Sequence, residues 1–73
     1  MMEHLRGLRE DRDLKQKQMA ELLKVHQTTY SAYELGTANI PVPVLKQLAE
    51  FFETSTDYLL DLTDERRPYP KKR

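Results

Sequence analysis

Apolar residues recur along the chain at intervals of three and four and divide it into five short segments. This spacing places each apolar set on one face of a helix, and no stretch alternates with period two for long enough to form a strand. The predicted helices cover residues 2–12, 16–23, 27–35, 43–52 and 56–62. The pattern therefore predicts an all-α domain of five short helices around one small core.

Turn and capping residues set the predicted ends of these helices. Gly36 stands where a helix commonly ends in a left-handed residue. Pro41 and Pro43 keep the following loop out of helical conformation, and Pro43 suits the first helical position. Ser55 can cap the last helix by accepting a hydrogen bond from its first turn. We expect that helix to bury Tyr58, Leu59 and Leu62.

The second and third helices are joined by a turn of only about three residues. Such a short connection prevents antiparallel packing, so the helices must cross steeply, which is the geometry of a helix-turn-helix. On the third helix the 100° step per residue turns Tyr30, Tyr33 and Glu34 toward the body of the protein. The outward positions near its start carry short uncharged side chains, those of Gln27, Thr28, Ser31 and Ala32.

Short uncharged side chains on an outward helix face suit the reading of base edges in the major groove of DNA. A glutamine amide can both donate to and accept from adenine, hydroxyl groups suit several base edges, and methyl groups can pack on the methyl of thymine. Lysine or arginine would add affinity at these positions, whereas selective hydrogen bonds add discrimination. From the residues alone, a plain solvated face remains the alternative.

Composition narrows the class of protein. The chain has 73 residues, enough for one small domain, and no cysteine, so disulfides and thiolate metal sites are excluded and a reducing, cytoplasmic setting is expected. No apolar run approaches the ~20 residues that span a bilayer, so no membrane partner is expected. Twelve basic and twelve acidic residues cancel, which argues against a strong sequence-blind binder of polyanions.

The charges are unevenly distributed along the chain. Residues 63–73 hold five basic and two acidic side chains together with two prolines, and they contain little that could be buried. We therefore predict a helical domain over residues 1–62 and a basic, proline-containing C-terminal tail over residues 63–73, mobile or loosely docked. A solubilising role for the tail is favoured over nonspecific contact with a polyanion.

Residues 5–62 resemble the five-helix, lambda-repressor-like domain of the phage-repressor and Cro type, the Xre-like helix-turn-helix regulators of bacteria and phages. The carrying motifs are LKQKQMAELL, with Met-Ala where the family has Leu-Ala, then TYSAYELG and the closing TDYLL. Each motif is weak alone, but their order and spacing are specific. The resemblance implies a sequence-specific regulator of transcription, with repression favoured, that binds double-stranded DNA as a homodimer on an inverted repeat.

The resemblance also implies which side chains meet DNA. Gln27 and Thr28 would be the first base readers, with Ser31 and Ala32 deeper along the groove. Gln16 would bind a phosphate, helped by the N–H groups and positive dipole of its helix end. The other phosphate contacts that the resemblance implies are Thr29, Thr37 and Asn39. Lys15 and Lys17 are expected to contact phosphate through their charge, because the loop before the fourth helix carries no basic residue.

Arg9 and Glu34 match an ion pair of the family that ties the reading helix to the rest of the fold. Other positions depart from the family. Lys15 and His26 replace the usual Ser or Thr N-caps, whose loss costs about 1 kcal/mol where nothing replaces them. Lys24 occupies a turn position where relatives often have Gly, and a positive φ would strain it. The loop before the fourth helix carries none of the basic residues that many relatives have there.

Some residues leave alternatives open. Phe51 and Leu60 lie off the main apolar stripes and are either peripheral core or contacts across a two-fold dimer interface. His4 and His26 lack a second ligand at metal spacing, so ordinary surface or helix-end positions are expected and no metal or cofactor is predicted. No phosphate loop or nucleophile–base pair supports an enzyme.

The second hypothesis is an antitoxin or accessory protein that uses the same fold mainly to bind a protein partner. The first hypothesis places the protein on the bacterial nucleoid when it is bound.

Overall fold

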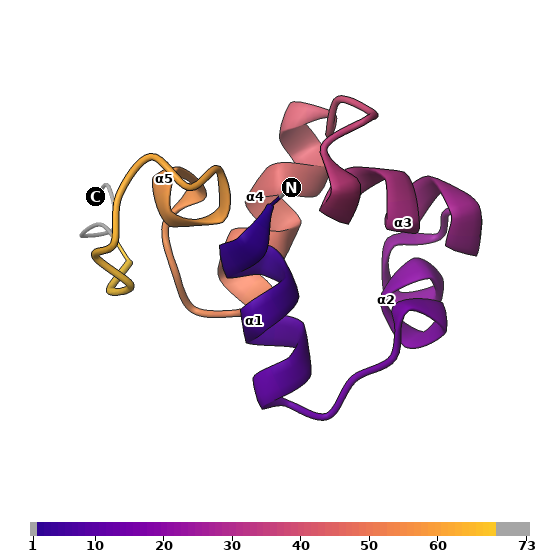
Figure 1. Ribbon diagram of the computed structural model, residues 1–73, viewed down its shortest axis with the longest axis horizontal. Coiled ribbons are helices and arrows are strands. Elements are labelled where there is room, and N and C mark those ends of the chain that lie inside the picture. Colours follow the sequence, from indigo (N-terminus) through magenta and orange to yellow (C-terminus); the bar gives the residue numbers. More distant parts are fainter. Residues whose placement is uncertain (1, 69–73) are drawn as a thin grey trace.

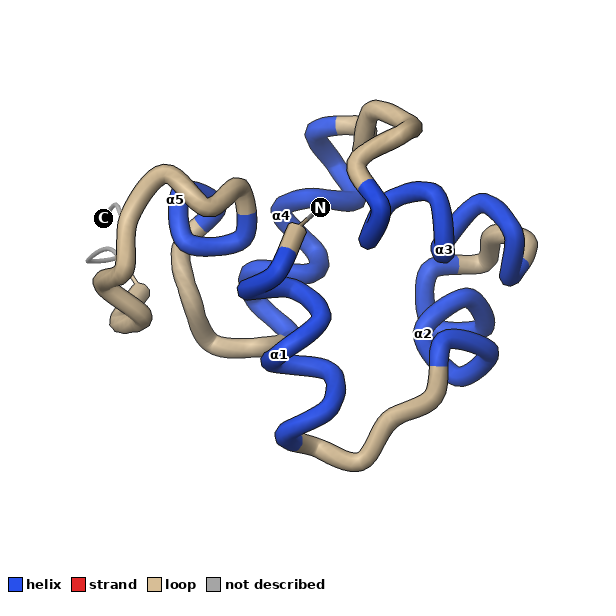
Figure 2. Tube along the Cα trace, in the orientation of Figure 1, coloured by secondary structure: helices blue, strands red, loops and turns tan. Residues whose placement is uncertain are grey.

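The computed structural model describes residues 2–68, and these form five helices and no strand. The helices are α1 (Glu3–Asp11), α2 (Gln16–Leu23), α3 (Gln27–Leu35), α4 (Val42–Phe51) and α5 (Thr56–Leu59). Figure 1 shows α1 near the centre of the view, with the α2–α3 pair on one side and α5 on the other. Figure 2 shows that short loops make all the connections between them. The predicted all-α fold of five helices is confirmed.

One apolar core holds the five helices together. Its largest fully buried side chains come from every helix, and they are Leu5, Leu8, Met19, Tyr30, Leu48 and Leu59. Burial of a large apolar side chain stabilises a fold by about 1.5–3 kcal/mol. Leu14 and Val25, from the two connections that flank α2, pack against the rim of this core. Because α1 packs against both α3 and α5, it links the two sides of the molecule.

Left-handed residues and prolines set the helix boundaries. The C-cap residue of α2, Lys24, has a φ of 58°, which a residue with a Cβ adopts at a cost of roughly 1 kcal/mol. α3 ends at Gly36 with a φ of 78°, where the absence of a Cβ removes that cost. α4 begins one residue before the predicted Pro43, with Pro41 as its N-cap residue. The left-handed cap predicted at Gly36 is confirmed.

α5 is shorter than predicted. Ser55 caps it as expected, its Oγ accepting a hydrogen bond from the Tyr58 N–H at 3.1 Å. The prediction that Leu62 is buried is wrong, because its side chain is 72% exposed. The physical reason is Asp61, which adopts a φ of 60° and ends the helical path, so that the Leu62 N–H turns back to the Asp57 carbonyl at 2.9 Å.

The segment after α5 contacts two other parts of the chain. The buried Thr54 hydroxyl donates to the carbonyl of Arg66 at 2.7 Å, and the Arg66 guanidinium lies 3.7 Å from the Asp11 carboxylate. Residues 69–73, which hold the rest of the predicted basic tail, lie outside the described residues. The longest described helix has ten residues, and none has the length and hydropathy that crossing a membrane requires.

Candidate nucleic-acid interface

α2 and α3 form a helix-turn-helix at one edge of the molecule (Figure 1). Three residues separate the helices, and the middle one, Val25, packs against the core while its N–H donates to the Ala20 carbonyl at 3.0 Å. α3 is also packed against α1. The turn and both neighbouring helices therefore fix the direction in which α3 points.

The two faces of α3 differ sharply in burial and chemistry. Tyr30, Tyr33 and Glu34 are at most 5% exposed, and the two tyrosine rings meet edge to face with centroids 6.5 Å apart. On the other face Gln27 and Thr28 are exposed. The remaining predicted contacts on this helix, Thr29, Ser31 and Ala32, are half-buried. The outward face of α3 is therefore most exposed at the start of the helix, where a partner would first contact the Gln27 amide and the Thr28 hydroxyl.

A buried ion pair fastens α3 to α1. Arg9 Nε donates to Glu34 Oε2 at 2.6 Å and Arg9 Nη2 to Glu34 Oε1 at 3.2 Å, with side chains 12% and 3% exposed. The third guanidinium nitrogen, Nη1, donates to the Leu14 carbonyl at 2.8 Å. Paired, hydrogen-bonded charges of this kind have a fixed geometry. They set the rotation of α3 about its axis.

The same network controls the ionisation of Glu34. Burial alone would raise the pKa of Glu34, but the hydrogen bonds from Arg9 and Gln16, together with the nearby Tyr30 hydroxyl, lower it below its ordinary value. Glu34 is therefore ionised at neutral pH. Burial and the nearby Glu34 carboxylate raise the pKa of Tyr30. The Tyr30 hydroxyl oxygen is itself buried and has no hydrogen bond of normal geometry among the described residues.

The start of α2 carries the predicted phosphate contacts Lys15, Gln16 and Lys17. Lys15 and Lys17 are exposed, whereas Gln16 is half-buried. The Gln16 amide nitrogen donates to Glu34 Oε1 at 3.2 Å, so one of its two hydrogens is used within the fold. The other hydrogen remains for a ligand at the surface.

Neither of the two N-cap positions in the helix-turn-helix has a side-chain cap. At Lys15 the missing cap is partly replaced, because Gln18 Oε1 accepts the Lys15 backbone N–H at 2.7 Å. His26 has the extended backbone of an N-cap residue, but its side chain makes no capping bond to α3. The first-turn N–H groups of a helix have no partner within the helix. An anion at the start of α3 would satisfy them and interact favourably with the helix dipole.

The loop after α3 contains the last two predicted contacts. Thr37 directs both its N–H (3.0 Å) and its hydroxyl (3.4 Å) to the Ala32 carbonyl. Its donors thus complete the end of α3. Asn39 is exposed, so of the two it is the side chain more available to a ligand.

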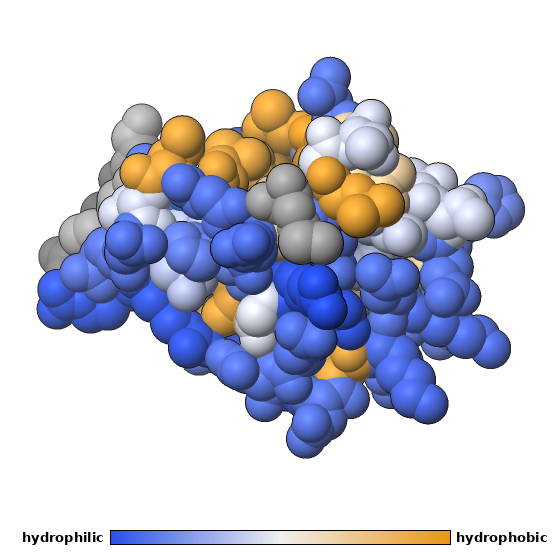
Figure 3. Space-filling view, in the orientation of Figure 1, coloured by the Kyte–Doolittle hydropathy of each residue, from blue (hydrophilic) through white to orange (hydrophobic). Residues whose placement is uncertain are grey.

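Phe51 is the last residue of α4, and Leu60 directly follows α5. Phe51 is half-buried, in edge contact with Phe52, and the Arg12 guanidinium lies 5.1 Å from its ring centroid. Leu60 is 42% exposed. Figure 3 shows apolar surface gathered along the edge over α5 and the start of α4, while the surface over α2 is hydrophilic. The two predicted contacts therefore differ, because only Leu60 is open to a partner.

Two features of this interface were missed from the sequence. The Gln16–Glu34 hydrogen bond joins residues 18 positions apart, and no local pattern indicates it. The Gln18 cap had a detectable signal, since a glutamine three residues after an N-cap is half of a capping box. Within residues 2–68, no three His, Cys, Asp or Glu side chains are arranged so that they could hold a metal ion.

Comparison with known proteins places this geometry in a family. A family model described as a helix-turn-helix domain matches residues 2–65. The chain is 35% identical over 66 residues to the uncharacterized HTH-type transcriptional regulator YobD of Bacillus subtilis (strain 168), covering 90% of this chain and 59% of YobD. It is 34% identical over 58 residues to YqaE of the same organism, also an uncharacterized HTH-type transcriptional regulator, covering 80% of this chain and 50% of YqaE.

A phage protein is similar as well. The cryptic phage CTXphi transcriptional repressor RstR of Vibrio cholerae is 40% identical over 48 residues, which cover 66% of this chain and 43% of RstR. The chain thus spans about half the length of the curated relatives it matches. No solved structure matches significantly. Given the family model and these relatives, the chain belongs to the Xre-like helix-turn-helix family.

Proposed function

We propose that this protein is a sequence-specific DNA-binding regulator of transcription that inserts the start of α3 into the major groove. One observation carries the proposal: α3 is locked on its inner face by the Arg9–Glu34 pair while its outer face starts with exposed Gln27 and Thr28. A reader of bases needs a helix of fixed rotation that presents selective hydrogen-bonding groups. Ser31 and Ala32 contact bases deeper in the groove.

Phosphate contacts position the helix on the duplex. Lys15, Gln16 and Lys17 at the start of α2 bind one strand, and the uncapped start of α3 brings its N–H groups and Thr29 to the backbone beside it. Asn39 contacts the backbone beyond the end of α3, with Thr37 holding the loop that carries it.

We further propose that two copies bind an inverted repeat. One short helix reads too few base pairs for useful specificity, and a two-fold dimer places two reading helices about 34 Å apart on one face of DNA. Exposed Leu60 and half-buried Phe51 contribute to the contact between copies. The bound dimer represses by occluding polymerase, a cytoplasmic function at the nucleoid that needs no cofactor or catalytic step.

The competing function is that of an antitoxin or accessory protein. A net charge of zero and the absence of basic residues from the loop between α3 and α4 favour it, because both reduce the attraction of a polyanion. In that case the outward face of α3 serves a protein partner. DNA binding then contributes little.

Selection of duplexes from a random library, followed by fluorescence-anisotropy titration at two salt concentrations, distinguishes the two functions. We expect a palindromic site bound at least about a thousandfold more tightly than random DNA. Weak binding that collapses with salt and ignores sequence would instead identify a protein-binding scaffold.

A further inference from the structure

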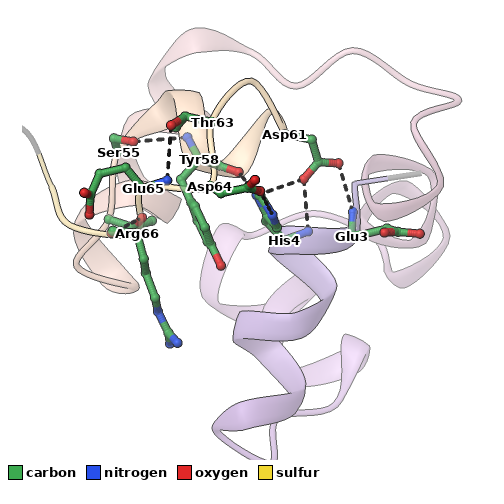
Figure 4. A network of polar contacts seen from close by, with 10 residues as sticks. Glu3, His4, Ser55, Tyr58, Asp61, Thr63, Asp64, Glu65 and Arg66 are labelled. Carbon is green, nitrogen blue, oxygen red and sulfur yellow. Dashed lines mark hydrogen bonds and ion pairs between the residues drawn. The ribbon is translucent and has the colours of Figure 1, made fainter.

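The first turn of α1 is capped by a residue from the other end of the domain. Asp61 Oδ2 accepts the Glu3 N–H and Asp61 Oδ1 accepts the His4 N–H, both at 3.1 Å (Figure 4). No side chain from the residue before α1 provides this cap. Asp61 can do so because its left-handed backbone turns the chain after α5 back toward α1. The carboxylate also suits the positive end of the helix dipole.

The His4 ring lies between α5 and this returning segment. It stacks on the Tyr58 ring with centroids 3.9 Å apart and planes 7° from parallel. His4 Nδ1 lies 2.7 Å from the Tyr58 carbonyl oxygen and 3.2 Å from Asp61 Oδ1, and Nε2 lies 3.4 Å from Asp64 Oδ1 (Figure 4). Both ring nitrogens thus face oxygen atoms that can only accept hydrogen bonds when the carboxylates are ionised.

We propose that His4, Tyr58, Asp61 and Asp64 form a proton-responsive clasp that fastens the segment after α5 to the start of α1. The Tyr58 carbonyl and the Asp61 carboxylate both face Nδ1, so that nitrogen must carry a proton whether the ring is neutral or charged. A neutral imidazole has only one N–H, so its Nε2 then directs a lone pair toward the Asp64 carboxylate. A second proton on Nε2 turns this unfavourable contact into a charge-assisted hydrogen bond. Protonation of His4 therefore closes the clasp at Asp64.

The charged groups around the ring support this direction. Asp61 and Asp64 face it from the segment after α5, Tyr58 contributes its ring and carbonyl from α5, and Glu3 and Arg6 are the neighbouring charges along α1. The two carboxylate oxygens lie 3.2 and 3.4 Å from the ring nitrogens, and opposite charges at such distances attract each other. Asp64 is fully exposed, so the added contact is a surface ion pair of modest strength.

The clasp connects two surfaces of the molecule. Asp61 lies between Leu60 and Leu62, which are 42% and 72% exposed, so the hydrogen bonds to Asp61 hold the backbone segment that carries both leucines. At the same end of α1, the Met2 N–H donates to the Glu34 carbonyl on α3 at 2.7 Å. In a regulator whose copies associate through Leu60, closing the clasp favours the dimer as the pH falls toward 5.5. Only this consequence rests on the proposed function.

Nitrogen-15 NMR of the histidine rings in the full chain, from pH 5.5 to 8.5, tests the proton positions without DNA. At high pH we expect neutral His4 to carry its proton on Nδ1, and His26, exposed and without a capping bond, supplies the comparison within the same sample. A neutral His4 with its proton on Nε2 would overturn the clasp.

Urea unfolding of the wild type and Asp64→Asn at pH 5.5 and 8.0 tests the response to protons. The unfolding constant of Asp64→Asn divided by that of the wild type should be about twofold to fivefold larger at pH 5.5 than at pH 8.0. This is the range expected for an exposed ion pair. His26→Gln is the matched control. Its unfolding constant divided by that of the wild type should change less between the two pH values. An equal Asp64→Asn ratio at both pH values contradicts the proposal, whether or not the protein binds DNA.

Discussion

The two ends of α1 attach to the rest of the molecule in contrasting ways. At its C-terminal end Arg9 holds α3 through a pair whose side chains are almost fully buried. At its N-terminal end His4 and the first backbone N–H groups hold the segment after α5 through partly exposed contacts. Burial keeps water and salt from the first attachment, whereas both act freely on the second. The contrast indicates that α1 holds α3 through a buried ion pair and holds the segment after α5 through contacts that solvent reaches.

Breaking the buried attachment should have the largest effect. Arg9→Ala and Glu34→Ala should each lower the free energy of unfolding by about 3–5 kcal/mol, because each leaves a buried charge without its partner. The double variant should lose less than the sum of the two single losses. Urea unfolding of the four proteins at pH 7 measures these values, with Arg6→Ala as a control for an exposed arginine on the same helix. Additive losses would show that the pair is not coupled.

The two attachments should respond to pH with opposite signs. The folded state lowers the pKa of Glu34, so its contribution to stability is complete above the ordinary value of 4.5 and is lost as the pH falls through the lower folded value. The clasp, in contrast, gains strength as the pH falls, because protonated His4 can donate from Nε2 to the Asp64 carboxylate. Unfolding free energies measured from pH 8 to pH 3 for the wild type and Glu34→Gln test the first response. The variant should lose the steep decline below pH 4.5.

A substitution that makes the backbone of α1 less flexible should stabilise the protein. Gly7 lies in the middle of α1, and a Cβ added there would meet no atom within 4 Å. Gly7→Ala should therefore raise the free energy of unfolding by about 0.5–1 kcal/mol, since alanine loses less entropy in a helix. Thermal unfolding measures the gain. A lower melting temperature would mean that the glycine serves a close approach that the monomer does not reveal.

The smallest expected effect concerns the buried hydroxyl of Tyr30. Because that oxygen has no hydrogen bond of normal geometry, Tyr30→Phe should change the free energy of unfolding by less than about 1 kcal/mol. Tyr33→Phe is the matched control on the same helix face. A loss well above that limit at Tyr30 alone would show that its hydroxyl does support Glu34.

Local patterns in the sequence were enough to predict the helix-turn-helix. The predicted bounds of α2 and α3 agree with the structure. Both were set by signals that lie within or directly beside each helix, namely the spacing of its apolar residues and, for α3, the glycine at its end. The burial of Leu62 was mispredicted because one left-handed residue, Asp61, redirects the chain, and nothing in the apolar spacing distinguishes it.

Contacts between distant residues were harder to predict. The pairing of Arg9 with Glu34 was expected from the family resemblance and not from periodicity, since these residues are 25 positions apart. The contacts of His4 with Tyr58 and Asp61 span 54 and 57 positions, and they exist only once α5 has folded against α1. His4 was expected at an ordinary surface or helix-end position; it lies in the first turn of α1, but its contacts with the segment after α5 were not predicted.

The central claim is that the outer face of α3 reads bases, and substitution of Gln27 tests it most directly. Affinities of the wild type, Gln27→Ala and Lys17→Ala should be measured on the selected site, on single-base variants and on random DNA. We predict that Gln27→Ala weakens the selected site by about 1–3 kcal/mol and relaxes preference at one position, while Lys17→Ala weakens all DNA alike. Equal loss for Gln27→Ala on selected and random DNA would contradict the claim.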